Sequence, residues 1–134
     1  MMQRIDIMFI LLGALMLVCG VGMGIYMGMA HDFSLAPVHA HANLVGWVSL
    51  TLFGIVYRIF PELKERRMAA THLGFAAPAA IAFPFGIYLA IFAEWPFLSI
   101  VAALAWMVGC LLFLAQLIGL AFAGGPDPVA VPAE

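Results

Sequence analysis

The sequence predicts an all-α integral membrane protein, a bundle of four transmembrane helices. Its composition and the length of its apolar runs carry this prediction. Hydrophobic residues make up 66% of the 134 residues, charged residues make up only 9%, and the mean hydropathy is +1.15. A soluble domain of this length needs far more charge on its surface. Four apolar runs each supply the roughly 20 helical residues that cross about 30 Å of hydrocarbon.

Charged and turn-forming residues bound the four runs, which extend over residues 7–30, 37–60, 68–92 and 96–123. Before the second run, Asp32 and Ser34 are candidate N-caps, and Pro37 suits a first helical turn because it lacks an N–H group. Residues 93–96 predict a tight turn before the last run. We expect residues 1–123 to form one transmembrane domain and residues 124–134, which lose the apolar pattern, to be a disordered tail.

The positions of Lys and Arg predict the orientation. All five lie before the first run or around the loop that follows the second run. The positive-inside rule then places both termini in the cytoplasm. We expect a multi-pass protein of a bacterial inner (cytoplasmic) membrane, surrounded by the lipid bilayer. A net charge of −2 with so few basic residues argues against a nucleic-acid-binding surface.

The most informative segment is HAHANLVGWVSLTLFGIVYRIFP, residues 39–61. It has membrane length, begins with His39 and His41, and contains a single Lys or Arg, Arg58. Placing a coordinating side chain at the edge of the hydrocarbon is costly, so such histidines usually bind a metal, a cofactor or a proton. The segment therefore predicts a binding site at the outer face of the membrane. His31, in the preceding loop, is a further candidate ligand.

A helical wheel separates the two histidines of this segment. At 100° per residue, His39 shares one face with small and polar residues, while His41 lies on a bulky apolar face nearly opposite. The residues that share the face of His39 are Asn43, Gly46, Leu50, Gly54 and Tyr57. We expect this face to point into the bundle, with Gly46 leaving a shelf below the imidazole and Asn43 hydrogen-bonding a ligand. His41 then faces lipid or a second protomer.

The run APVHAHANLVGWVSLTLFGIVYRIFP resembles transmembrane helix two of haem-copper oxidase subunit I, in the form found in cbb3-type oxidases and nitric-oxide reductases. The run DFSLAPVHAHANLVGW is also similar to small stand-alone membrane proteins of the subunit-I-like type. The resemblance covers a minor part of the chain. It implies haem b as the cofactor, because the family helix supplies an axial histidine to a low-spin haem. The His-x-Asn arrangement of the family falls on His41 and Asn43, whereas the wheel favours His39, so the choice of ligand stays open.

The chain also departs from that family. A complete oxidase subunit has further helices that carry the second low-spin ligand, the high-spin haem and the copper-binding histidines. With four histidines in all, this chain does not provide the binuclear centre, so we expect electron transfer or gas or haem sensing rather than oxygen reduction, and enzyme activity stays an open question. A second axial ligand would come from His31, from the other histidine of the same helix or from another copy. We therefore expect a homo-oligomer or association with respiratory-chain subunits.

His72, near the start of the third run, is expected at the opposite membrane face, roughly 20 to 25 Å in depth from His41. It is either an interfacial histidine bonded to headgroups or to a backbone carbonyl, or a second haem ligand. Gln116, a lone polar residue in the fourth run, predicts a hydrogen bond between helices. Cys19 and Cys110 are expected to be buried small apolar residues rather than a disulfide or a metal pair.

Two rival functions follow from other features. The first is a copper-binding or copper-handling membrane protein that uses His31, His39, His41 and the methionines of the first helix, because thioether sulfur suits copper(I). The second is a non-catalytic accessory subunit of a respiratory complex. It would pack through the small-residue face of the first helix, formed by Gly20, Gly24 and Gly28.

Overall fold

The structure is a computed structural model that describes residues 4–64 and 67–122. Over these residues it contains helices only: α1 (Ile5–Ala30), α2 (Ala36–His41), the π-helix η2 (Ala42–Ser49), α3 (Leu50–Ile59), the 3₁₀-helix η3 (Pro61–Leu63), α4 (Arg67–Phe92) and α5 (Phe97–Ala121). The segments α2, η2 and α3 form one continuous span, so four helical spans are long and apolar enough to cross a membrane. The predicted all-α fold with four membrane-length helices is confirmed over the described residues. The expected tail, residues 124–134, lies outside the described residues.

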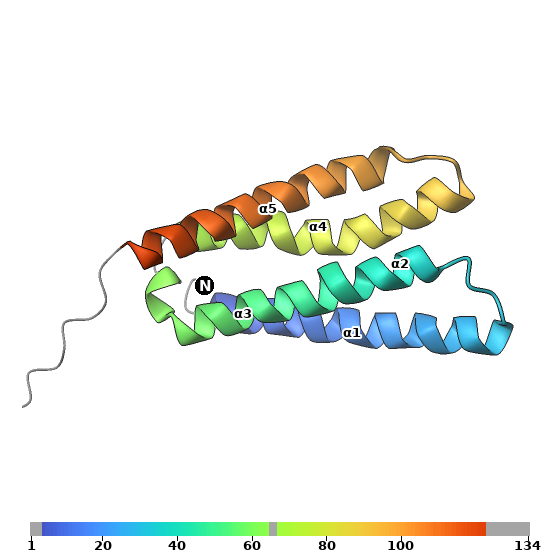
Figure 1. Ribbon diagram of the computed structural model, residues 1–134, viewed down its shortest axis with the longest axis horizontal. Helices are drawn as coiled ribbons and strands as arrows, with labels where there is room; N and C mark the ends of the chain where they lie inside the picture. The colour runs from blue at the N-terminus through green and yellow to red at the C-terminus, as the bar shows by residue number, and fades with distance from the viewer. Residues whose placement is uncertain (1–3, 65–66, 123–134) are drawn as a thin grey trace, which may run out of the picture.

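The four spans form two helical hairpins that lie side by side (Figure 1). In the first hairpin α1 runs along the α2–η2–α3 span, and in the second α4 runs along α5. The start of α1 and the end of α5 lie at the same end of the bundle. We call this end the basic end, because it carries Arg4, Arg58, Lys64 and Arg67. The opposite end is the acidic end, where Asp32 and Glu94 are the charged residues of the two loops.

The loop between α1 and α2 differs from the prediction. Leu35 occupies the N-cap position of α2 and makes no side-chain capping bond, so the proposed caps Asp32 and Ser34 are wrong. The Oδ1 atom of Asp32 instead accepts a hydrogen bond of 2.9 Å from the backbone N–H of Ser34, an Asx turn that competes with capping. This bond holds the pKa of Asp32 below its usual range. Pro37 lies in the first turn of α2, as predicted.

Glycines let α1 approach the second span closely. A Cβ atom on Gly20 would lie 2.5 Å from the side-chain amide of Asn43, and one on Gly46 would lie 2.6 Å from the terminal methyl group of Met16. The face that includes His39 therefore packs inside the bundle, as the wheel predicted. The expected open shelf at Gly46 is wrong, because the side chain of Met16 already fills it.

Candidate functional site

His39 is held between α2 and α1. Its Nδ1 atom lies 2.9 Å from the carbonyl oxygen of Gly20. Asn43 donates from Nδ2 to the carbonyl oxygen of His39 at 2.8 Å, one turn earlier in the same span. A Cβ atom on Gly24 would lie only 3.2 Å from Cε1 of His39. The small-residue face of α1 is thus filled, over Gly20 and Gly24, by side chains of its own hairpin.

His41 turns toward the second hairpin. Its Nδ1 atom lies 2.8 Å from the carbonyl oxygen of Pro37. Its ring meets Phe83 of α4 edge-on, with 4.9 Å between the ring centroids. The prediction that His41 faces lipid or a second protomer is therefore incomplete, because the ring is half-buried and α4 covers one side of it. A wheel separates the faces of one helix but does not say which neighbouring helix covers each face, and here α4 covers part of the apolar one.

In both histidines the Nδ1 atom of the ring is bonded to a backbone carbonyl oxygen. A carbonyl oxygen only accepts hydrogen bonds, so Nδ1 is the donor in each ring, and in the neutral imidazole Nε2 then carries the lone pair. In the part of the chain that the structure describes, neither Nε2 has a hydrogen-bond partner. A metal-ligating histidine characteristically has its other nitrogen bonded to a carbonyl or carboxylate in this manner. His39 faces α1 while His41 faces α4, so the two rings do not converge on one iron.

The helix changes its geometry immediately after His41. Residues Ala42–Ser49 form a π-helix of eight residues, and the hydroxyl group of Ser49 donates to the carbonyl oxygen of Leu44, five residues earlier, at 2.7 Å. π-Helical turns are rare and occur frequently at functional sites. The sequence analysis missed this feature, because a wheel of 100° per residue assumes an α-helix throughout. Gly46 lies within the segment, but no residue pattern in it predicts the wider turn.

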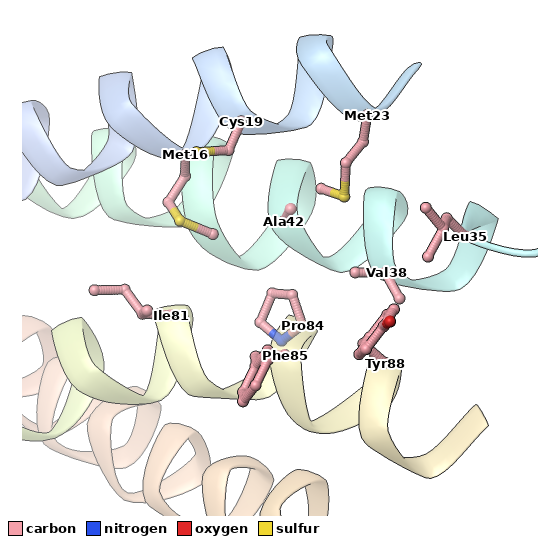
Figure 2. Close-up of a pocket in the computed structure, with 10 residues that line it drawn as sticks. All are labelled: Met16, Cys19, Met23, Leu35, Val38, Ala42, Ile81, Pro84, Phe85 and Tyr88. Carbon is pink, nitrogen blue, oxygen red and sulfur yellow. The ribbon is translucent and has the colours of Figure 1, made fainter. Parts of the chain in front are cut away.

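An apolar cavity of about 480 Å³ lies between α1, α2 and α4 (Figure 2). Met16, Cys19 and Met23 line it from α1, Val38 lines it from α2 and Ala42 from the start of η2. In the sequence Val38 and Ala42 flank the two candidate histidines, yet neither histidine lines the cavity. Cys19 is exposed on the protein and Cys110 is half-buried, so their predicted full burial is wrong, although both are free thiols, as expected.

His72 lies in a closed cluster near the basic end. Its side chain is 0% exposed, so the interpretation as an interfacial histidine bonded to headgroups is wrong. Its Nδ1 atom lies 2.9 Å from the hydroxyl group of Tyr57, and Gln116 donates from Nε2 to the same hydroxyl at 2.8 Å. The ring centroids of Phe9, Phe53 and Phe113 lie 5.0, 4.7 and 5.4 Å from that of His72. The predicted interhelical bond of Gln116 is confirmed.

The sequence analysis missed two features of the basic end. One is the hydroxyl of Tyr57, which joins His72 to Gln116; the clue was three polar side chains in apolar runs, which need one another in lipid. The other is Asp6, fully buried, whose Oδ2 atom lies 3.2 Å from both Arg58 Nη1 and Lys64 Nζ. These ion pairs join the start of α1 to the end of the second span. Their clue was a carboxylate at the edge of an apolar run.

The candidate ligands do not form a cluster of the kind that binds a bare metal ion. His31 ends α1 in a left-handed conformation, with φ of 51°, and is exposed. Over residues 4–64 and 67–122, no group of three or more His, Cys, Asp or Glu side chains is placed to hold a metal ion. The copper site expected from His31, His39 and His41 is therefore not formed within the described part of one protomer.

Comparisons with protein families, with curated proteins and with solved structures found no match to this chain. The likeness of the second span to a helix of haem-copper oxidase subunit I consequently depends on the residues of that span alone.

Proposed function

We propose that the chain is a membrane protein that binds haem b and acts in electron transfer or in sensing a diatomic gas or haem. The observation that supports this most strongly is the hydrogen bonding of the His41 ring and its position next to the π-helix. Its Nδ1 is anchored on the carbonyl of Pro37, its Nε2 has no partner among the described residues, and a π-helix begins at the next residue. Haem iron needs only one or two ligands from the protein, unlike a tetrahedral metal site.

His41 is the better of the two candidate ligands. The ring of His39 is partly buried between α1 and α2, and it and Asn43 occupy the space beside Gly20 and Gly24. His41 instead lies between the hairpins, beside Phe83, and matches the His-x-Asn arrangement of the oxidase helix. We assign His41 as the axial ligand. His39, Asn43 and Gly46 are positioning residues, because they fix the second span against α1.

The surroundings of His41 suit an apolar cofactor. Ala42, the next residue, lines the apolar cavity between α1, α2 and α4, and Pro84, next to Phe83, lines it from α4. Such walls exclude water and, with the axial ligand, are the means by which a protein sets a haem's potential. The haem supplies the electron-transfer chemistry, while the chain supplies ligation, orientation and a dry environment.

One protomer supplies one axial ligand in this arrangement, because His39 and His41 face different helices. A second ligand would come from another copy of the chain or from a respiratory-chain partner. Without one, the iron keeps a position for a diatomic gas. Homo-oligomerisation therefore favours electron transfer, and a monomer favours sensing.

A reduced-minus-oxidised spectrum of the protein, expressed with added haem and purified in mild detergent, tests the proposal. We expect a Soret band and a b-type α band, with roughly one iron for each chain or pair of chains. Copper without haem would instead support the copper-handling function. The absence of both metals would support an accessory subunit of a respiratory complex.

We also propose that the basic end faces the cytoplasm of a bacterial cell and that the acidic end, with His39 and His41, faces outward. The segregation of all described Lys and Arg residues at one end supports this orientation. Reporter fusions after residue 134 and near Ser34 test it. An outward-facing C-terminus would reverse the side assigned to the histidines.

A further inference from the structure

A second pocket, of about 280 Å³, lies at the acidic end and has an unusual lining. Three aromatic side chains and one carboxylate surround it: Tyr26 of α1, Asp32 in the following loop, and Tyr88 and Phe92 of α4. The rings of Tyr88 and Phe92 lie 4.8 Å apart between centroids. Ser34 and Leu35 complete the lining. Tyrosine and phenylalanine rings beside a carboxylate are the side chains that recognise ammonium groups, particularly quaternary ones.

The charge at this end of the bundle also favours a cation. The loop residues Asp32 and Glu94 are acidic, and every described Lys and Arg lies at the opposite end. The backbone N–H of Ser34 fixes the carboxylate of Asp32 and keeps its pKa low, so the charge is present at neutral pH. No basic side chain lines the pocket to compete for it.

The acidic-end pocket lies next to the apolar cavity described above. Leu35 and Tyr88 line both spaces. In Figure 2 these two residues lie at one end of the cavity, where α2 begins, while Met16 and Ile81 lie toward the other end. An anionic, aromatic mouth at the acidic end thus adjoins an apolar space of about 480 Å³ that extends deeper along the helices. This succession matches a molecule with a cationic head and an apolar chain.

We propose that the acidic end binds a lipid with an ammonium headgroup. The head lies against Asp32 and the rings of Tyr26, Tyr88 and Phe92, and an acyl chain enters the apolar cavity between α1, α2 and α4. Neither space is lined by a histidine, but the apolar cavity is also the one that the proposed function places beside His41, so an acyl chain and a haem would exclude one another there. The test below therefore uses protein expressed without added haem.

The two cysteines provide an internal measurement of cavity occupancy. Cys19 lines the cavity, whereas Cys110, on α5, does not. The rates at which N-ethylmaleimide alkylates each thiol can be followed by peptide mass spectrometry on the full chain in a maltoside detergent. We expect lysophosphatidylcholine to slow alkylation of Cys19 by about tenfold and to leave Cys110 unchanged. Lysophosphatidylglycerol with the same acyl chain, which has no ammonium group, should protect Cys19 much less.

Two carboxylates allow a matched control for the headgroup. Asp32→Asn should abolish the difference between the two lysolipids, while Glu94→Gln, which removes the same charge from the same end but outside the pocket, should keep it. Free choline can be added to compete with lysophosphatidylcholine. If it restores the alkylation rate of Cys19, the headgroup alone binds the pocket. If it has no effect, binding requires the acyl chain as well as the headgroup. Equal protection by both lysolipids in the unaltered protein, or no protection by either, would overturn the proposal. An unchanged rate at Cys110 verifies that each variant is folded.

Discussion

The two halves of the bundle differ in how completely they bury their polar side chains. Toward the basic end, the hydroxyl of Tyr57 bonds to both His72 and Gln116, and all three side chains are fully buried beside aromatic rings. Toward the acidic end, His39 and His41 are only partly buried, each is held through Nδ1 by a backbone carbonyl, and an apolar cavity lies between the hairpins. The buried cluster joins α3, α4 and α5, so we expect the basic half to hold the hairpins together, and we propose that the acidic half receives the ligand.

The largest expected effect on stability is at His72. Replacing His72 with alanine removes a ring packed among Phe9, Phe53 and Phe113 and leaves the hydroxyl of Tyr57 without one of its partners. We expect the free energy of unfolding to fall by about 3 kcal/mol. Unfolding in a titration with sodium dodecyl sulfate, followed by circular dichroism, measures it. The exposed His31 is the matched control, and His31→Ala should change the value by less than about 0.5 kcal/mol. Equal effects of the two variants would mean that the basic half is not the stabilising one.

A smaller effect is expected where α1 and α3 touch. A Cβ atom on Gly54 would lie 2.7 Å from the backbone oxygen of Asp6, which has little freedom to move, whereas one on Gly74 of α4 would meet nothing within 4 Å. Gly54→Ala should therefore destabilise the protein by about 2 kcal/mol in the same titration. Gly74→Ala should leave stability unchanged or raise it slightly, since alanine favours a helix. A neutral Gly54→Ala would show that the two helices are not packed this closely.

The smallest expected effect on the free energy of unfolding concerns the two basic side chains that pair with the buried carboxylate of Asp6. Lys64, whose side chain is 15% exposed, and Arg58, which is 68% exposed, both pair with it. Exposed pairs contribute little because water screens them. Lys64→Met should cost about 1 kcal/mol and Arg58→Met less than about 0.5 kcal/mol. A larger loss of stability for Arg58→Met than for Lys64→Met would mean that the exposed pair with Arg58, and not the pair with Lys64, holds the start of α1.

The sequence predicted the fold well because a bilayer imposes simple requirements of length and apolarity on each span. It also located His39 and His41, because coordinating residues at the hydrocarbon edge are costly and therefore informative. The surroundings of the two rings depend on which helix lies beside which face, and one span alone does not determine that. The contact between His41 and Phe83 and the burial of His72 by Tyr57 both join residues distant in sequence. The π-helix escaped prediction for a different reason: no local residue pattern specifies it.

Difference spectra of three single variants test the ligand assignment most directly. His41→Ala should abolish the b-type spectrum or convert it from its low-spin form, because the axial nitrogen is lost. His39→Ala, two residues away, should keep the spectrum in those molecules that elute as folded particles in size-exclusion chromatography. His72→Ala should also keep it in the folded fraction, because His72 lies near the basic end. Loss of haem in His72→Ala alone, with normal spectra for the other two variants, would contradict the assignment and place the haem near the basic end.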